Sequence, residues 1–190
     1  MKMEVLQSKL ILGTLIGLLI LGQTLAGNNA SMNVTATIPA VGEIRLTHHS
    51  SDEAITNPSL TFTPTASQIL SAAEGPIYIS PLTTPSFDRV SYLVNRGGSW
   101  SVAVKALGTP SLPEGLSLSD VQLLYSPDDG DGNPAGGNTL SLSTSDQTVD
   151  SNSKKTNSFR HTSLAYQLYL NGDEAEGNVE VVLQFTLTTP

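Results

Sequence analysis

Apolar and polar residues alternate in several short runs along this chain, a pattern typical of β-strands with one buried face. The clearest run covers residues 179–187, where every second residue from Val179 to Leu187 is large and apolar. A similar run covers residues 164–170, and an Asn-Gly-Asp sequence at 171–173 ends it. Because Asn-Gly pairs favour tight reversals of the chain, the two runs predict a terminal β-hairpin with an acidic tip.

A second pair of alternating runs lies in the middle of the chain. Residues 90–94 and 99–105 are joined by an Asn-Arg-Gly-Gly sequence at 95–98, which predicts another hairpin. Trp100, the only tryptophan, shares one face of the second run with two valines. Because a large aromatic side chain on such a face buries much apolar surface, Trp100 is expected to anchor the core.

The remaining strands are shorter, and residues 66–73 favour the one short helix. Short strands separated by turn residues, with no linker or internal repeat between them, are typical of a sandwich. The pattern therefore predicts an all-β fold, a single two-sheet antiparallel β-sandwich of about ten short strands. The weaker strand candidates are residues 33–38, 43–47, 60–63, 77–80, 121–125 and 139–142.

Two long polar stretches are expected to be loops. Residues 126–137 are rich in aspartate, glycine and proline, and residues 143–162 are polar throughout. Such compositions favour turns over regular structure. In the second stretch, Lys154, Lys155 and Arg160 cluster near the end.

The N-terminus has a different pattern. Lys2 and Lys9 provide a basic start, and the apolar run that follows ends at the small-x-small sequence Thr24-Leu25-Ala26. An apolar run shorter than the ~20 residues of a membrane span, with that cleavage pattern, predicts a secretory signal peptide at residues 1–26. The mature domain, residues 27–190, is therefore expected to be extracellular or at the cell surface. Membrane contact is expected only through an uncleaved signal peptide.

Composition narrows the classes of partner and of chemistry. The formal net charge is −8, and the chain contains no cysteine. An acidic chain is repelled by the phosphates of nucleic acid, which excludes nucleic acid as an expected partner. Without cysteine there is no disulfide, so stability must come from packing and sheet hydrogen bonds.

The sequence lacks the motifs of common catalytic centres, namely a nucleophile elbow, a zinc-binding His-Glu-x-x-His and a phosphate-binding glycine loop. Its histidines are His48, His49 and His161. The adjacent pair is expected either to point to opposite faces of a strand or to lie at the end of one. Because two neighbours on a strand cannot both reach one metal without a bend, we expect exposed polar residues rather than metal ligands. We interpret the chain as non-catalytic and without a cofactor. Because a Ser/His/Asp triad needs no closeness in sequence, a secreted hydrolase remains a third hypothesis.

One acidic stretch has the spacing of a calcium loop. Asp129, Asp131 and Asn133 alternate like the first ligands of such a loop. Leu140 stands where the closing glutamate belongs, and Pro134 stands where the turn glycine belongs, which excludes the helix-loop-helix form. The two remaining interpretations are a looser calcium site and an acidic hairpin loop.

Residues 92–102 and 183–190 resemble the two signature regions of WxL-domain surface proteins. In that family an Asn-Arg-Gly turn leads to a Trp-x-Leu strand, and a second Trp-x-Leu strand finishes near a terminal proline. Here Val102 replaces the first leucine and Phe185 replaces the second tryptophan. The resemblance implies a domain held non-covalently at a Gram-positive cell wall, with cell-wall polymer or other surface proteins as partners. The residues that carry it are Asn95, Arg96, Gly97, Trp100 and Phe185.

Residues 33–38 also resemble the donor strand of cysteine-free fimbrial subunits. Asn33, Val34, Ala36 and Ile38 would form this strand, which completes an open sheet edge in a neighbouring subunit. The same segment could instead pair within its own domain.

The first hypothesis is therefore an exported cell-surface β-sandwich that mediates wall attachment or protein or glycan binding. The alternative is a self-assembling subunit of an extracellular fibre or pilus.

Overall fold

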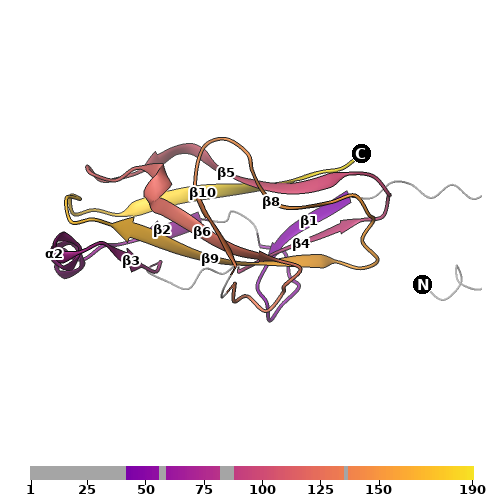
Figure 1. The fold of residues 1–190 in the computed structure, drawn as a ribbon, viewed down its shortest axis with the longest axis horizontal. Coiled ribbons are helices and arrows are strands. Elements are labelled where there is room, and N and C mark those ends of the chain that lie inside the picture. The colour runs from indigo at the N-terminus through magenta and orange to yellow at the C-terminus, as the bar shows by residue number, and fades with distance from the viewer. Residues whose placement is uncertain (1–41, 56–58, 82–87, 135–136) are drawn as a thin grey trace, which may run out of the picture. The chain divides into compact units, whose positions relative to one another are not determined.

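The computed structural model describes residues 42–55, 59–81, 88–134 and 137–190, and these residues form an all-β sandwich of two antiparallel sheets (Figure 1). All of these residues belong to one compact unit, Pro39–Pro190, which holds the sandwich. The predicted signal peptide and the predicted strand at residues 33–38 lie outside the described residues.

The first sheet has six strands, in the order β1-β4-β9-β6-β7, with β3 also paired to β9. The strand β9 is long enough for two partners on one edge, β4 beside its first half and β3 beside its last three residues. The strands are β1 (Gly42–Thr47), β3 (Ile77–Ile79), β4 (Arg89–Val94), β6 (Val121–Pro127), β7 (Asn138–Ser141) and β9 (Arg160–Leu170).

The second sheet has four strands, in the order β2-β10-β5-β8. They are β2 (Ser59–Phe62), β10 (Val179–Thr188), β5 (Trp100–Ser111) and β8 (Gln147–Asn152). A helix, α2 (Ala66–Glu74), follows β2, and Thr65 and Gln68 form a capping box at its start. A short 3₁₀ helix, η1 (Leu118–Asp120), precedes β6.

The core lies between the two sheets, where the alternating apolar faces meet. Trp100 is only 3% exposed, which confirms the expectation that it anchors the core. Its ring lies 5.3 Å from that of Tyr92 on the opposite sheet, measured between centroids. Phe185 and Leu187, near the end of β10, are only partly buried against this core.

Both predicted hairpins are wrong, because each turn joins strands of different sheets. β4 belongs to the first sheet and β5 to the second, and the same holds for β9 and β10 (Figure 1). The apolar faces of each pair therefore meet across the core rather than along a shared edge. The hairpin that does form joins β6 to β7 across the acidic loop.

The predicted loop at 143–162 is also partly wrong. It contains all of β8 and the first three residues of β9. The single large apolar side chain of β8, Val149, is buried, and a β-bulge opposite Val102 and Ala103 places the next residue, Asp150, in the interior as well. A bulge breaks the alternation by which a strand is recognised, so the sequence pattern conceals this strand.

Candidate functional site

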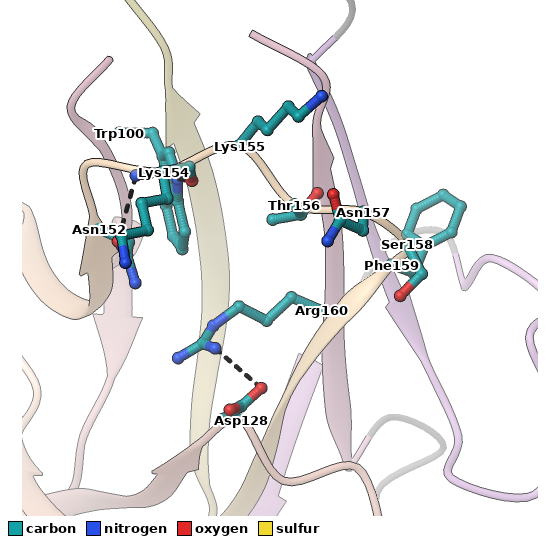
Figure 2. Close-up of a pocket in the computed structure, with 10 residues that line it drawn as sticks. All are labelled: Trp100, Asp128, Asn152, Lys154, Lys155, Thr156, Asn157, Ser158, Phe159 and Arg160. Carbon is teal, nitrogen blue, oxygen red and sulfur yellow. Dashed lines mark hydrogen bonds and ion pairs between the residues drawn. The ribbon is translucent and has the colours of Figure 1, made fainter. Parts of the chain in front are cut away.

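A pocket lies at the end of the sandwich where the β8–β9 loop, residues 153–159, contacts the β4–β5 turn (Figure 2). Its cavity volume is about 340 Å³. The loop begins with an Asx turn, in which the Asn152 side-chain oxygen accepts from two following backbone N–H groups. The lining residues are Trp100, Asp128, Asn152, Lys154, Lys155, Thr156, Asn157, Ser158, Phe159 and Arg160.

Hydrogen bonds to strand ends and to Trp100 hold this loop in place. The Trp100 Nε1–H donates to the Lys154 carbonyl oxygen at 2.7 Å. The Thr156 N–H donates to the Val94 carbonyl at 2.8 Å, and the Val94 N–H donates to the Thr156 hydroxyl at 2.9 Å. The buried tryptophan therefore shapes the pocket from below instead of offering its ring as a binding platform.

A buried carboxylate fixes the arginine at the base of the pocket. Asp150 is 8% exposed, and its Oδ2 accepts from Arg160 Nε at 2.7 Å and from the Tyr92 hydroxyl. Arg160 Nη1 also lies 2.8 Å from Asp128 Oδ1, an ion pair visible in Figure 2. Burial alone lowers the pKa of Arg160, but the hydrogen bond and charge of Asp150 raise that pKa above its ordinary value. Arg160 is therefore a permanent, oriented cation.

Basic side chains gather around the pocket although the chain is acidic. Of its nine lysines and arginines, three line the pocket and two more lie on segments that contact its lining, and we call these five the basic rim. Arg45 contributes by stacking its guanidinium 4.5 Å from the centre of the Phe159 ring. Among the described residues, no ion pair is formed by Arg96, Lys154 or Lys155. The basic rim consists of Arg45, Arg96, Lys154, Lys155 and Arg160.

The structure brings the two regions that resemble WxL signatures together. The turn at 95–98 carries Asn95, Arg96 and Gly97, and it contacts the β8–β9 loop through the Gly98 N–H, which donates to the Ser153 carbonyl. Gly98 has a φ of +133°, and a Cβ there would lie 2.6 Å from the Pro190 ring. The turn therefore packs against residue 190. Phe185 of β10 pairs with Val104 of β5, and Val104 lies four residues after Trp100 on the same strand. The aromatic residues of the two signature regions, Trp100 and Phe185, therefore lie on neighbouring strands.

The acidic loop that has the spacing of a calcium loop uses its side chains within the loop. The Asp131 N–H donates to Asp129 Oδ1 at 3.1 Å, and the Asn133 N–H donates to Asp131 Oδ1 at 2.7 Å. Ser163 holds the loop against β9, because its hydroxyl accepts from the Gly132 N–H at 3.0 Å. These bonds are typical of an acidic hairpin loop, and calcium binding by Asp129, Asp131 and Asn133 stays a prediction.

The adjacent histidines lie side by side. His48 and His49 lie on a turn after β1, with ring centroids 4.2 Å apart, and both contact Asp88. Of the two expected placements, the structure has the one at the end of a strand, and the bend there brings the two rings together. His161 Nδ1 lies 2.8 Å from the Ser91 hydroxyl, so this residue is half-buried and hydrogen-bonded rather than fully exposed.

Two buried tyrosines predict that stability falls at alkaline pH. Burial, followed by the hydrogen bond to Asp150, raises the pKa of Tyr92, and burial raises the pKa of Tyr166. A pKa raised by folding stabilises the protein fully below the unfolded value, about pH 10, and this contribution is lost as pH rises further. Phenolate absorbance should show two tyrosines that ionise only together with the loss of far-UV circular dichroism. Ionisation of all five tyrosines before unfolding would contradict this prediction.

Among the described residues, no helix is long and apolar enough to cross a membrane. No protein-family profile and no curated protein matches the chain. Among solved structures, the chain is similar to the PA14 domain of the MpAFP antifreeze protein, with 15% sequence identity and a TM-score of 0.28, over 84% of this chain and 87% of that domain.

Proposed function

We propose that this chain is an exported, non-catalytic cell-surface β-sandwich that attaches to an anionic polymer of the cell wall through the basic rim. The observation that carries the proposal is the concentration of basic side chains at one pocket of an acidic chain, where three of the nine line the pocket and Arg45 and Arg96 lie on segments that contact its lining. Export rests on the signal-peptide pattern of residues 1–26.

The state of each cation supports binding to anions. Arg160 is held in one orientation by Asp150 and Asp128, whereas Lys154 and Lys155 are exposed. A fixed guanidinium beside exposed ammonium groups can hold a phosphate or carboxylate from several sides. The net charge of −8 repels anions from the rest of the chain, so this end would be the one that faces a polyanion.

The residues that line the pocket indicate which class of polymer it would bind. The amide and hydroxyl groups of Asn152, Asn157 and Ser158 line the pocket beside the cations, so sugar hydroxyls can be bound together with the charged group. Trp100 is buried and cannot stack on a sugar ring. Charge therefore dominates the proposed recognition, and an anionic glycopolymer fits better than a neutral glycan.

The lysines provide the direct test of this attachment. Replacing both by alanine, Lys154→Ala with Lys155→Ala, should weaken binding of the full chain to isolated cell walls by about tenfold or more, because hydrogen bonds between charged groups contribute about 1.5–3 kcal/mol each. Cosedimentation with purified walls measures the affinity. Binding of the unaltered chain should fall steeply between 0.1 M and 1 M salt, where the Debye length shrinks from about 10 Å to about 3 Å.

A matched control separates local from general charge effects. Lys105→Ala removes one lysine charge from β5, outside the pocket, where Lys105 pairs with Asp146 at 3.4 Å. This variant should bind walls like the unaltered chain, whereas the single variant Lys155→Ala should bind more weakly. Equal losses in both variants, or none in either, would refute the attachment site.

A fibre subunit is the second candidate function, and an open edge of the second sheet favours it. β2 pairs with β10 only through residues 179–182. Among the described residues, no strand pairs with residues 183–188 on that edge of β10. Unpaired backbone groups on a sheet edge are a template for an added strand.

An apolar groove runs beside this open edge. Its cavity volume is about 300 Å³, and it separates the edge strand β1 from β10. Alternating apolar side chains of an added strand, such as Val34, Ala36 and Ile38 of a neighbouring copy, would fit such a groove. The groove residues are Ile44, Arg45, Leu46, Ala54, Ile55, Leu107, Leu183, Gln184 and Phe185.

Deletion of residues 27–38 distinguishes the two functions. If the attachment function holds, the full chain should elute as a monomer at every concentration, and deletion should destabilise that monomer without dissolving any assembly. If the fibre function holds, electron microscopy should show filaments that the deletion abolishes. A synthetic peptide of residues 31–40 should then bind the deleted protein. Size-exclusion chromatography of both proteins provides the comparison.

A further inference from the structure

Three metal-ligating side chains converge where β1 ends. Asp88 Oδ2 lies 3.3 Å from His48 Nε2 and 2.5 Å from His49 Nδ1. The three donor atoms all lie within 4.8 Å of one another. This group is separate from the basic rim and from the acidic side chains considered for calcium.

A tight turn produces this convergence. His48 and Ser51 form a β-bridge, and the Ser51 N–H donates to the His48 carbonyl at 2.9 Å, so the chain reverses directly after Thr47. Asp88 lies beside this turn because its N–H donates to the Thr47 carbonyl, next to the first pair of the β1–β4 ladder. Two adjacent imidazoles that would diverge on a straight strand are thereby directed at one carboxylate.

We propose that His48, His49 and Asp88 bind one divalent transition-metal ion of the zinc type. Zinc accepts imidazole nitrogen and carboxylate oxygen at about 2.0–2.2 Å in tetrahedral geometry, which places neighbouring ligand atoms about 3.3 Å apart. The His48–Asp88 separation already has this value. The His49–Asp88 hydrogen bond would open by about 0.8 Å as the metal replaces the shared proton. Two nitrogen donors favour zinc over calcium or magnesium, which prefer oxygen.

The surroundings leave room for an ion and hold the carboxylate. Gly132 has a φ of +74°, and a Cβ there would lie 2.6 Å from Asp88 Oδ2 and 2.7 Å from His49 Nδ1. A side chain at position 132 would therefore occupy the place where the donors meet. The second oxygen of Asp88 accepts from the His49 N–H at 2.7 Å, which orients the carboxylate.

The site would keep one position open. The three protein ligands leave a fourth tetrahedral position for water or for a donor atom of another molecule. His49 is the most exposed of the three, with 44% of its side chain accessible, whereas the Asp88 side chain is 13% accessible. The ion would thus be anchored by a mostly buried carboxylate and reached from solvent through the histidines.

Zinc binding by the full chain, purified without a polyhistidine tag and freed of metal by a chelator, tests the proposal. Isothermal titration with Zn²⁺ should give one ion per chain. His49→Ala and Asp88→Asn should each weaken this binding more than about 100-fold, because loss of an outer-shell partner alone costs about 10–100-fold. His161→Gln is the matched control, and it should bind zinc like the unaltered chain.

Three results would overturn the site. These are no binding of Zn²⁺, binding that survives in both His49→Ala and Asp88→Asn, and binding that falls equally in the His161→Gln control. Circular dichroism of each variant verifies that it is folded. Should Asp88→Asn fail to fold, His48→Ala replaces it, with the same expected loss. Displacement of bound Zn²⁺ by a moderate excess of Ca²⁺ would also contradict a nitrogen-containing site.

Discussion

Replacing Trp100 by alanine should lower the free energy of unfolding by about 3–5 kcal/mol, the range for deleting a buried aromatic side chain. The ring is 3% exposed and packs against Tyr92 across the two sheets. Its Nε1–H also holds the β8–β9 loop through the Lys154 carbonyl. Urea titration followed by circular dichroism measures the change, since Trp100 is the only tryptophan and its fluorescence is lost in the variant.

Trp100→Phe is the matched control for this experiment. It keeps an aromatic ring in the core but removes the hydrogen bond to the loop, so we expect the free energy of unfolding to fall by a smaller amount, about 1–2 kcal/mol. If Trp100→Ala left the urea midpoint unchanged and weakened wall binding alone, the ring would be a binding residue, and its assignment to the core would be wrong.

Replacing Asp150 by alanine should lower the free energy of unfolding by about 3 kcal/mol. Removing one member of a buried ion pair leaves the other charge uncompensated, at a cost of about 3–5 kcal/mol. Here Arg160 keeps Asp128 as a second partner, which favours the lower end of that range. The Tyr92 hydroxyl also loses its carboxylate acceptor. Because Arg160 would lose its fixed orientation, wall binding should weaken in the same variant.

Asp150→Asn separates shape from charge. The amide keeps the volume of the carboxylate and an acceptor oxygen, so the free energy of unfolding should fall less than in Asp150→Ala, by about 1–2 kcal/mol. The same urea titration measures both variants. A free energy of unfolding for Asp150→Ala within about 0.5 kcal/mol of the unaltered chain would contradict a structural role for this network.

The positions of strands could be predicted from the sequence where only one face of the strand is apolar, because apolar and polar residues then alternate. The runs around Trp100 and Phe185 became β5 and β10, and residues 66–73 became α2. The pairing of strands could not be predicted, because alternation identifies the buried face of a strand but not which sheet it joins. The β4–β5 and β9–β10 turns cross between sheets, where hairpins were expected.

The candidate site was only partly predictable. The cluster of Lys154, Lys155 and Arg160 is visible in the sequence, and the Arg96 turn was singled out by the resemblance to WxL signatures. Asp150 could not be found, because a bulge in β8 directs it inward and such bulges leave no clear sequence signal. For the histidine pair, a metal role depends on a bend after β1, and the sequence does not show whether the chain bends there.

Fractionation of the cells that produce this protein tests the attachment function most directly. We expect the unaltered chain to be found with the cell wall and to be released by a high-salt wash. A charge-reversed variant, Lys154→Glu with Lys155→Glu, should instead be found in the medium, whereas Lys105→Glu should remain with the wall. Retention of the charge-reversed variant at the wall, or recovery of the unaltered chain from the cytoplasm, would contradict wall attachment through the basic rim.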